Sequence, residues 1–526
     1  MKRSIAILLA CALAASCASS RPDAQQKDAG ANRITIFHTN DIHASFTSSV
    51  ATWRDDEPQI GGFAALEYHL AKERETAPHS LYLDAGDFMT GNPISNIERN
   101  GVLGGPLIEL LERAGLDAMA LGNHEFDHPQ PNPRKIIETA SFPILSANVL
   151  REDGTYFTDK PYVIREAGGA RIGIIGLSPD DLAQLVGGDA LAGLTTKASV
   201  DVLPSIIAEI DPLTDVIVLL THEGVEIDRK IAAAVPGIDI IVGGHSHTRL
   251  ENGEWVNGVF ITQAGSKLRN LGRMDFRVEN DAVTDVEYRL IPLWADDITP
   301  PAEAVAMIAK FQKEIDDEYG VVVAQSAGEL GRNYHQESDL GNWMTERVRR
   351  ATGADVAFLN SGGLRKNMPA GEIKKLDIVE ILPFSNMLCT FPITGAKLIE
   401  VIEQNIETGL SEAHGILQMS GIQVEWGQTE DKVYVAEAKL GNDRDGYTTP
   451  VDPDAVYTVG TVDYVGTSQP LKYLGYQPEN VQGLGRVLSD SILETLVEDP
   501  AVAAPTARRA IRHHQSSPTH SIQNAG

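Results

Sequence analysis

ITIFHTNDIH (34–43) sets the pattern of the N-terminal half of this chain, a short apolar run that ends in residues able to bind a metal ion. Stretches with helical spacing, such as GGPLIELLERAG (104–115), separate this run from six similar ones. Those are LYLDAGD (81–87), DAMALGNHE (117–125), ARIGIIGLS (170–178), DVIVLLTHEG (215–224), DIIVGGHSH (239–247) and VFITQAG (259–265). Continuous Ile, Val and Leu runs are typical of strands buried on both faces. The alternation predicts a layered α/β domain with central β-sheets over residues 33–299.

Five of the seven runs end in side chains that bind metals. They are Asp41 and His43; Asp84 and Asp87; Asn123 and His124, with Asp127 close behind; His222; and His245 and His247. A lone Asp after a strand usually caps a helix, but here the residue types recur at the same end of successive strands. Open α/β sheets bind ligands at that end, so we expect these groups to converge in one crevice. Carboxylate, imidazole and amide ligands without cysteine suit Mn, Fe or Zn rather than a closed structural zinc site.

The length of the chain predicts its number of domains, and its net charge limits the classes of molecule that it can bind. A chain of 526 residues predicts two domains. Lys and Arg number 44 against 73 Asp and Glu, which gives a net charge of −29. Such a surface excludes nucleic-acid polymers as partners, because binding them requires Lys and Arg to neutralise phosphates. Small anionic substrates remain possible, since bound divalent cations reverse the local charge.

The N-terminus has the features of an export signal. Lys2 and Arg3 precede an apolar stretch over residues 5–15, which is of signal-peptide length and too short to span a membrane. The small residues before Cys17 resemble a bacterial lipobox, so residues 1–17 are a predicted signal peptide with lipidation at Cys17; plain signal cleavage is the alternative. Residues 18–32 are predicted to form a flexible tether. We therefore expect an exported bacterial protein, periplasmic or anchored as an outer-membrane or cell-surface lipoprotein.

A second, smaller α/β domain is predicted after the first. Pro300 and Pro301 end the first domain, and residues 300–320 are predicted to contain a connecting helix. Residues 321–500 mix helical stretches (340–353 and 395–406) with strands (422–426, 432–440 and 456–464). The Ala-, Pro- and Ser-rich tail 501–526 is predicted to be disordered.

FHTNDIHASF, DAGDFMTGNPISN, DAMALGNHEFD, THEG and GGHSH, in this order, resemble the metallophosphoesterase domain of the 5′-nucleotidase family. NSGGLR (360–365) and LPF (382–384) resemble that family's C-terminal substrate-binding domain. The resemblance implies that two divalent cations, drawn from Mn, Zn, Fe, Co and Mg, are held by two sets of ligands. One set of ligands is Asp41, His43 and His247, and the other is Asn123, His222 and His245. By the same resemblance, Asp84 would bridge the two ions. His124 and Asp127 would form the catalytic pair.

The same resemblance implies substrate contacts in the second domain. Asn360 and Arg365 would contact the sugar or phosphate, and Phe384 and Tyr464 would sandwich a nucleobase. Core packing is the alternative for each aromatic ring. Arg332 is the nearest arginine before the ESDLGN segment (337–342), where the family often has one. GTSQP (466–470) replaces the usual G-G-D-G after the second aromatic, which weakens the assignment of a nucleoside monophosphate as the substrate.

We therefore expect metal-dependent hydrolysis of nucleotide phosphate esters. Two cations lower the pKa of bound water to about 7, and the resulting hydroxide attacks phosphorus in line. Hydrolysis of nucleotide sugars or of 2′,3′-cyclic phosphodiesters belongs to the same chemistry. The alternatives are a sulfur-oxidation thiohydrolase, which resembles this family in both domains, and a catalytically silent nucleotide-binding surface lipoprotein. The oligomeric state is left open.

Overall fold

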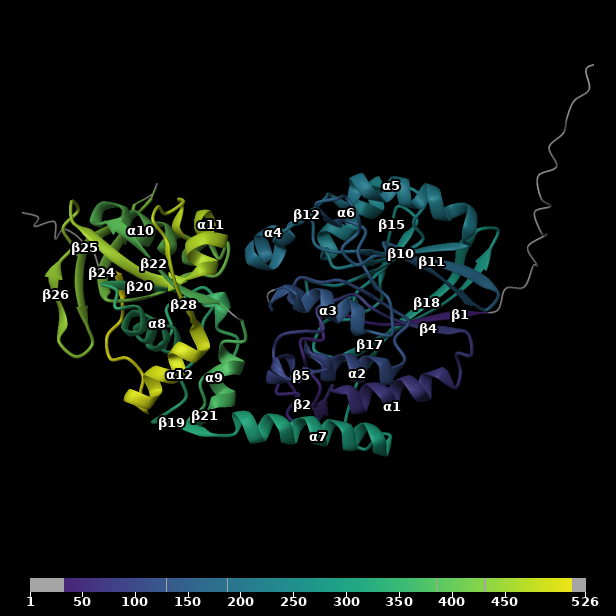
Figure 1. Cartoon of the computed structure of the whole chain (residues 1–526), viewed down its shortest axis with the longest axis horizontal. Coiled ribbons are helices and arrows are strands. Elements are labelled where there is room, and N and C mark those ends of the chain that lie inside the picture. Colours follow the sequence, from purple (N-terminus) through teal and green to yellow (C-terminus); the bar gives the residue numbers. More distant parts are fainter. Residues whose placement is uncertain (1–32, 129, 187, 385, 430–431, 513–526) are drawn as a thin grey trace, which may run out of the picture.

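The structure is a computed structural model that describes residues 33–128, 130–186, 188–384, 386–429 and 432–512. It has two lobes, and the long helix α7 (Ala302–Tyr319) runs beneath the N-terminal lobe and leads into the C-terminal lobe (Figure 1). The predicted signal peptide with Cys17 and the predicted tether lie outside the described residues. Within the described part of the chain, no helix is long and apolar enough to cross a membrane.

Two six-stranded sheets form the centre of the N-terminal lobe. The first has the order β18 (Ala282–Pro292), β17 (Asn270–Glu279), β1 (Ile34–Thr39), β4 (Ser80–Asp84), β7 (Ala118–Ala120) and β8 (Ile144–Leu145). The second has the order β10 (Tyr162–Ala167), β11 (Ala170–Leu177), β13 (Val216–Thr221), β14 (Ile240–Gly243), β16 (Val259–Thr262) and β15 (Glu254–Val256). All seven apolar runs form strands. The strands β1, β4, β7 and β8 pair in parallel, as do β11, β13, β14 and β16.

Hydrophobic burial explains how the two sheets and their helices pack. Ile36 of β1 and Leu83 of β4 share one core cluster with Val218 of β13 and Ile240 of β14, so the sheets pack face to face. Helices cover the outer faces, since a strand buried on both sides needs a second apolar layer. These helices are α1 (Phe63–Arg74), α2 (Gly105–Ala114), α3 (Asn132–Thr139), α5 (Ser199–Ile210) and α6 (Val225–Ala234).

Short elements complete the N-terminal lobe. They are β2 (Ser49–Val50), β3 (Gln59–Ile60), β5 (Glu98–Arg99), β6 (Val102–Leu103), β9 (Val149–Arg151), β12 (Leu194–Thr196), α4 (Leu182–Leu185), η1 (Pro93–Asn96), η2 (His124–Phe126), η3 (Gly188–Leu191) and η4 (Asp211–Leu213).

The C-terminal lobe contains a mixed five-stranded sheet and a four-stranded sheet. The former has the order β23 (Leu417–Ser420), β20 (Val356–Asn360), β27 (Val456–Val462), β22 (Met387–Thr394) and β28 (Gln482–Val487). The latter has the order β26 (Gly446–Pro450), β25 (Val433–Asn442), β24 (Ile422–Gln428) and β30 (Ala510–Arg512). The other strands are β19 (Val322–Ser326), β21 (Gly371–Lys374) and β29 (Ala501–Val502). The helical elements are α8 (Asp339–Thr352), α9 (Lys375–Ile381), α10 (Gly395–Ser411), α11 (Pro470–Leu474), α12 (Leu488–Glu498), η5 (Ser361–Gly363) and η6 (Tyr464–Ser468).

The start of the tail differs from the expectation of disorder. Strand β29 pairs with β19, and β30 pairs in parallel with β24. Arg509 is 1% exposed, and its guanidinium donates to both carboxylate oxygens of Asp443. These contacts order residues 501–512 despite their composition, and residues 513–526 lie outside the described part.

Candidate metal centre

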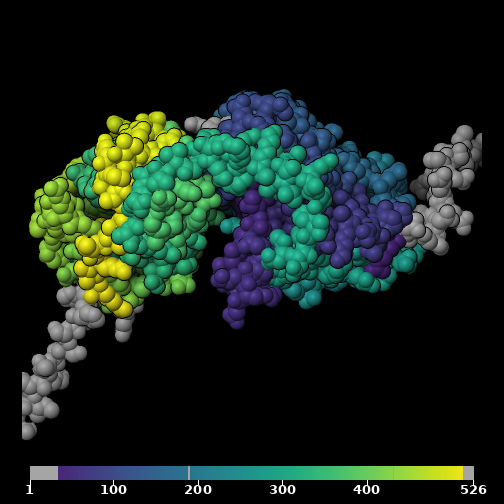
Figure 2. All heavy atoms as spheres, turned by 90° about the horizontal axis from the view of Figure 1, so that it is seen from below, coloured from purple at the N-terminus to yellow at the C-terminus, as the bar shows by residue number. Residues whose placement is uncertain are grey.

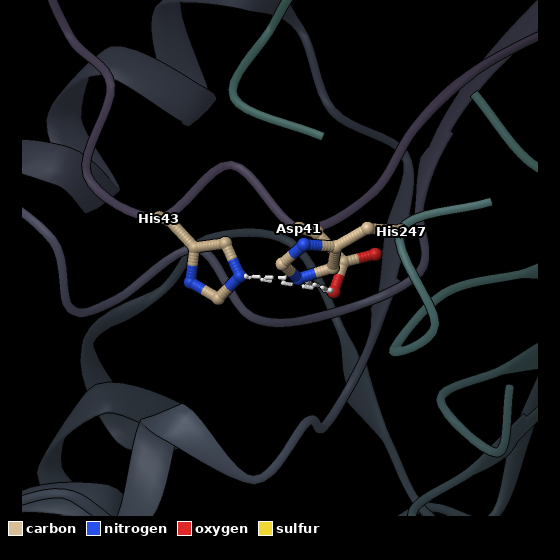
Figure 3. Close-up of side chains that lie close together, drawn as sticks. All are labelled: Asp41, His43 and His247. Carbon is tan, nitrogen blue, oxygen red and sulfur yellow. Dashed lines mark hydrogen bonds and ion pairs between the residues drawn. The ribbon is translucent and has the colours of Figure 1, made fainter. Parts of the chain in front are cut away.

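The first group of candidate ligands lies where β1 and β14 end. The Nε2 atoms of His43 and His247 are 2.8 Å apart, and Asp41 Oδ1 lies 3.3 Å from His247 Nε2. Figure 3 shows both imidazole rings pointing toward the Asp41 carboxylate. The three side chains direct their donor atoms at one small region, as a shared cation requires.

A second group adjoins the first and contains Asp87, His222 and His245. Asn123 extends it, because its Oδ1 lies 3.1 Å from His245 Nδ1. His222 Nδ1 donates to Ala85 O at 2.6 Å, which leaves the lone pair of His222 on Nε2. This buried Nε2 has no hydrogen-bond partner among the described residues, and Asp87 Oδ2 lies 2.9 Å from it. A divalent cation would satisfy this nitrogen, so the donor set fits a metal.

Asp87, and not the expected bridging residue Asp84, belongs to the groups of side chains that could hold a metal. Asp84 Oδ2 accepts a hydrogen bond from Thr39 Oγ1 at 2.6 Å, and Asp84 Oδ1 accepts one from Gly86 N at 2.9 Å. Asp84 belongs to neither ligand group, whereas Asp87 also groups with His43 and His124. Asp84 lies in β4 and packs inward; Asp87 lies in the loop beyond it and turns toward the imidazoles.

The backbone of these loops is unusual at the ligands. Five candidate ligands have φ in the left-handed region: Asp41 (51°), His43 (47°), Asp87 (60°), His245 (71°) and His247 (53°). Only glycine and, less readily, Asn or Asp adopt this region without strain. Gly122 permits the close approach of the loops, because a Cβ there would stand 2.2 Å from Asp87 Oδ1. The loops are held in a shape that suits ligation rather than local backbone preference.

His124 and Asp127 form a hydrogen-bonded pair beside the ligand groups, with His124 Nδ1 2.6 Å from Asp127 Oδ2. Burial opposes protonation of His124, but the carboxylates of Asp127 and Asp87 outweigh it and raise the pKa of His124 to about 9. In His43, by contrast, burial lowers the pKa to about 3. His124 is thus suited to carry a proton and His43 to remain a neutral ligand.

Glu125 holds together two loops that carry candidate metal ligands, a role that the sequence did not predict. Its carboxylate accepts hydrogen bonds from the backbone N–H groups of Asp87 at 3.2 Å, Phe88 at 2.9 Å and Gly122 at 2.8 Å. A single buried side chain therefore joins the loop after β4 to the loop after β7. Its place beside His124 in the sequence was the available signal.

The C-terminal lobe reaches the centre through Phe384. The Phe384 ring stacks on the His124 imidazole at a centroid distance of 5.8 Å, and the Arg365 guanidinium lies 5.7 Å from the Phe384 ring centroid. A cavity of about 230 Å³ adjoins Phe384 and is lined also by Asn96 and Tyr319. Viewed from the side of α7, the surface is hollowed between the lobes (Figure 2).

The remaining predicted substrate residues are Tyr464, Asn360 and Arg332. Tyr464 begins η6, and its ring centroid lies 6.0 Å from that of Tyr473, an α11 residue that sequence analysis did not identify. Asn360 is 4% exposed at the end of β20, and Arg332 is exposed. No ring contact joins Phe384 to Tyr464 within the described residues, which leaves the predicted base sandwich a prediction.

Comparisons with known proteins agree with this geometry. Residues 34–249 match the family model described as calcineurin-like phosphoesterase, and residues 319–469 match the model of the 5′-nucleotidase C-terminal domain. With its facing groups of Asp and His ligands, the N-terminal lobe is that of a metal-dependent phosphoesterase. The second match makes the assignment more specific: the chain belongs to the 5′-nucleotidase family and is a metal-dependent hydrolase.

Individual relatives extend over most of the chain. Protein UshA of Escherichia coli is 26% identical over 490 residues, which covers 83% of this chain and 85% of UshA. The crystal structure of a 5′-nucleotidase precursor from Thermus thermophilus is similar with a TM-score of 0.75 and 25% identity, covering 92% of this chain and 100% of the other. The Thermus thermophilus sulfate thiohydrolase SoxB shares the fold at 17% identity and a TM-score of 0.69, covering 91% and 96%.

Proposed function

We propose that this chain hydrolyses the phosphate esters of nucleotides with two divalent cations, and that Asp87, rather than Asp84, bridges those ions. The stacking of Phe384 on His124 carries the proposal, because it brings the substrate lobe to the metal ligands. The nucleotidase relatives support nucleotides as the substrate class. Asp41, His43 and His247 would hold one ion, and Asn123, His222 and His245 the other.

The protein's own groups define the remaining chemistry. When bound, the two cations would supply hydroxide near neutral pH and neutralise charge on the phosphoryl group. His124, protonated on Nε2, would donate a hydrogen bond to the transferring phosphoryl group or leaving oxygen. Asp127 orients the ring by accepting from His124 Nδ1 at 2.6 Å. Arg365 would contact the substrate oxygens, since guanidinium suits bidentate recognition of anions.

A hydrolysis screen that measures inorganic phosphate, nucleoside monophosphates and sulfate tests the proposal, because cyclic nucleotides, UDP-glucose and thiosulfonates release no phosphate in their first cleavage. Metal-stripped protein would receive Mn, Zn, Co, Mg or Ca and then AMP, ADP, a 2′,3′-cyclic nucleotide, UDP-glucose or a thiosulfonate-bearing carrier protein. We expect phosphate from a nucleotide substrate only after a metal is restored. Hydrolysis of the thiosulfonate carrier alone would identify a thiohydrolase instead, and inactivity on every substrate would identify a silent protein.

We also propose that the protein is exported and lipidated at Cys17. Lys2, Arg3, the apolar stretch 5–15 and the small residues before Cys17 support this placement. Labelled fatty acid should be incorporated into the full-length chain in bacteria but not into Cys17→Ser. Equal labelling of both proteins would contradict the site.

A further inference from the structure

Gln263 directly follows β16, and its side chain is 0% exposed beside the loop that carries two candidate metal ligands. That loop consists of residues 244–248 and directly follows β14, and we call it the histidine loop. Its His247 belongs to the first group of ligands, and its His245 belongs to the second. The shape and position of the histidine loop therefore determine how far apart the two ligand groups lie.

The Gln263 amide holds the histidine loop at three points. Its Nε2 donates a hydrogen bond to Gly244 O at 2.8 Å. Its Oε1 accepts hydrogen bonds from Ser246 Oγ at 2.9 Å and from Thr248 N. Each histidine of the loop lies between two of these partners in the sequence. Both candidate ligands are thus flanked, before and after, by residues that are bonded to one amide group.

The histidine loop needs such support because its backbone is strained. The φ angle is 71° at His245 and 53° at His247, in the left-handed region that disfavours residues with a Cβ. Without support, the loop would relax toward ordinary conformations and move the two imidazoles. The hydrogen bonds of Gln263 oppose that relaxation. Since Gln263 Oε1 already accepts two hydrogen bonds, this residue acts on cations through the histidines and not as a ligand.

The residues after Gln263 connect to the other loop of the first ligand group. Ala264 N donates to Asn40 Oδ1 at 2.8 Å, and Asn40 Nδ2 donates to Gly265 O at 2.6 Å. The same Nδ2 lies 2.6 Å from Asp41 Oδ2 and donates to it. The segment that begins at Gln263 therefore contacts both the histidine loop and the residue next to Asp41, and it can fix the two loops relative to each other.

We propose that Gln263 is a positioning residue that sets the spacing of the two candidate cations through the histidine loop. The inference rests on the proposed function, because it concerns the two ions named there. An amide suits this role, since it carries a donor and an acceptor on one planar group and adds no charge beside the ligands. Groups that orient metal ligands from behind are a large part of what fixes metal affinity and geometry.

Binding of Mn²⁺ alone to the metal-stripped chain tests this role without turnover. Two Mn²⁺ ions held about 3.5–4 Å apart are exchange-coupled, and their EPR spectrum differs from that of isolated Mn²⁺. Gln263→Met keeps a side chain of similar length and removes all its hydrogen bonds to the loop. In this variant the second Mn²⁺ should bind about 10–100-fold more weakly, and the coupled EPR signal should fall accordingly.

A milder variant covers the case in which Gln263→Met does not fold. Gln263→Asn keeps a polar amide in the site but is shorter by one methylene, so it cannot reach all three partners at once. It should give a smaller loss of the coupled signal in the same direction. A full coupled signal in either folded variant would overturn the positioning role of Gln263.

Gln418→Met is the matched control, because Gln418 is a buried glutamine of the C-terminal lobe. Its Nε2 donates to Gln336 O at 2.9 Å, and its Oε1 accepts from Ser338 N at 3.0 Å. The loss of these buried hydrogen bonds should lower the Tm and leave Mn²⁺ binding and the coupled signal unchanged. Equal losses of the coupled signal in Gln263→Met and Gln418→Met would also overturn the positioning role. One uncoupled Mn²⁺ in the unchanged chain would instead overturn the two-cation site of the proposed function.

Discussion

Asp84 and Asp87 are three residues apart, yet only Asp87 faces the imidazoles. The two oxygens of Asp84 are used by Thr39 and Gly86, so this carboxylate holds β1 and β4 in position. Asp87 Oδ2 lies 2.9 Å from His222 Nε2 and 3.8 Å from His124 Nε2. The residue that joins both ligand groups is the one beyond the end of the strand.

The exchange of each aspartate for asparagine separates these roles. Asp84→Asn retains an oxygen acceptor and should lower metal affinity by about 10–100-fold, as is typical of a residue that supports ligands. Asp87→Asn should lower metal affinity further, because it removes a charged ligand of both ions. Metal content after dialysis and kcat/KM would be measured for each variant. Retention of both metals in Asp87→Asn would disprove the bridging role.

His124 should matter for turnover and not for metal content. His124→Ala removes the proton donor and should reduce kcat by about 10²–10⁴-fold. Asp127 acts through the same imidazole, so the double variant His124→Ala/Asp127→Ala should be no slower than His124→Ala alone. His128→Ala is the control, because the His128 ring is hydrogen-bonded to Ser95 O, with Nε2 3.2 Å from that oxygen. If the double variant lost kcat by the product of the two single losses, His124 and Asp127 would act independently.

At the scale of elements, β30 shows how a three-residue strand can anchor a lobe. Glu337, just before α8, accepts hydrogen bonds from Arg509 N at 2.8 Å and Ala510 N at 3.2 Å. The Arg509 guanidinium lies 5.2 Å from the Tyr447 ring centroid and pairs with Asp443. The end of the described chain thus joins β24, the hairpin of β25 and β26, and the segment just before α8.

Loss of the Arg509 side chain should destabilise the C-terminal lobe. Arg509→Ala should lower its free energy of unfolding by about 2 kcal/mol, less than the full value for a buried pair because the Asp443 side chain is 29% exposed. Urea unfolding would measure the change. Arg508→Ala, at a side chain that is 62% exposed, should have no measurable effect. Equal stability of both variants would show that β30 contributes little.

Across the whole molecule, the lobes have largely separate hydrophobic cores. Buried side chains between residues 324 and 502 form one cluster of the C-terminal lobe, and the N-terminal lobe has three clusters. The candidate metal ligands all lie in the N-terminal lobe. Ligands that bind only the folded state stabilise that state, so metals should stabilise the two lobes unequally.

Thiol labelling and calorimetry would test this. Cys389 in β22 is 2% exposed, and burial raises the pKa of its thiol to about 12, so it should react only when the C-terminal lobe opens. In protein lacking residues 1–32, added Mn or Zn should raise the Tm of a first transition, and leave the temperature of Cys389 labelling nearly unchanged. A single transition that shifts together with labelling would show that the lobes unfold as one unit.

How far the sequence predicts this structure depends on the range of the interactions. Ile, Val and Leu runs identified β1, β13 and β14 because burial on both faces selects such residues. The same runs located the ligand loops, but they could not distinguish Asp84 from Asp87, since both lie at the end of one run and the direction of each side chain depends on the turn. The order in β30 and the stacking of Phe384 on His124 depend on contacts between residues distant in the sequence, which periodicity does not encode.

The left-handed backbone at His43, His245 and His247 has a consequence for protein engineering. Each such residue costs roughly 1–2 kcal/mol relative to an ordinary conformation. A search for heat-resistant variants of the metal-free chain would therefore select Gly or Asn at these positions, and each gain in heat resistance would remove a ligand. Selection for thermal stability and selection for catalytic rate would therefore favour different residues at these positions.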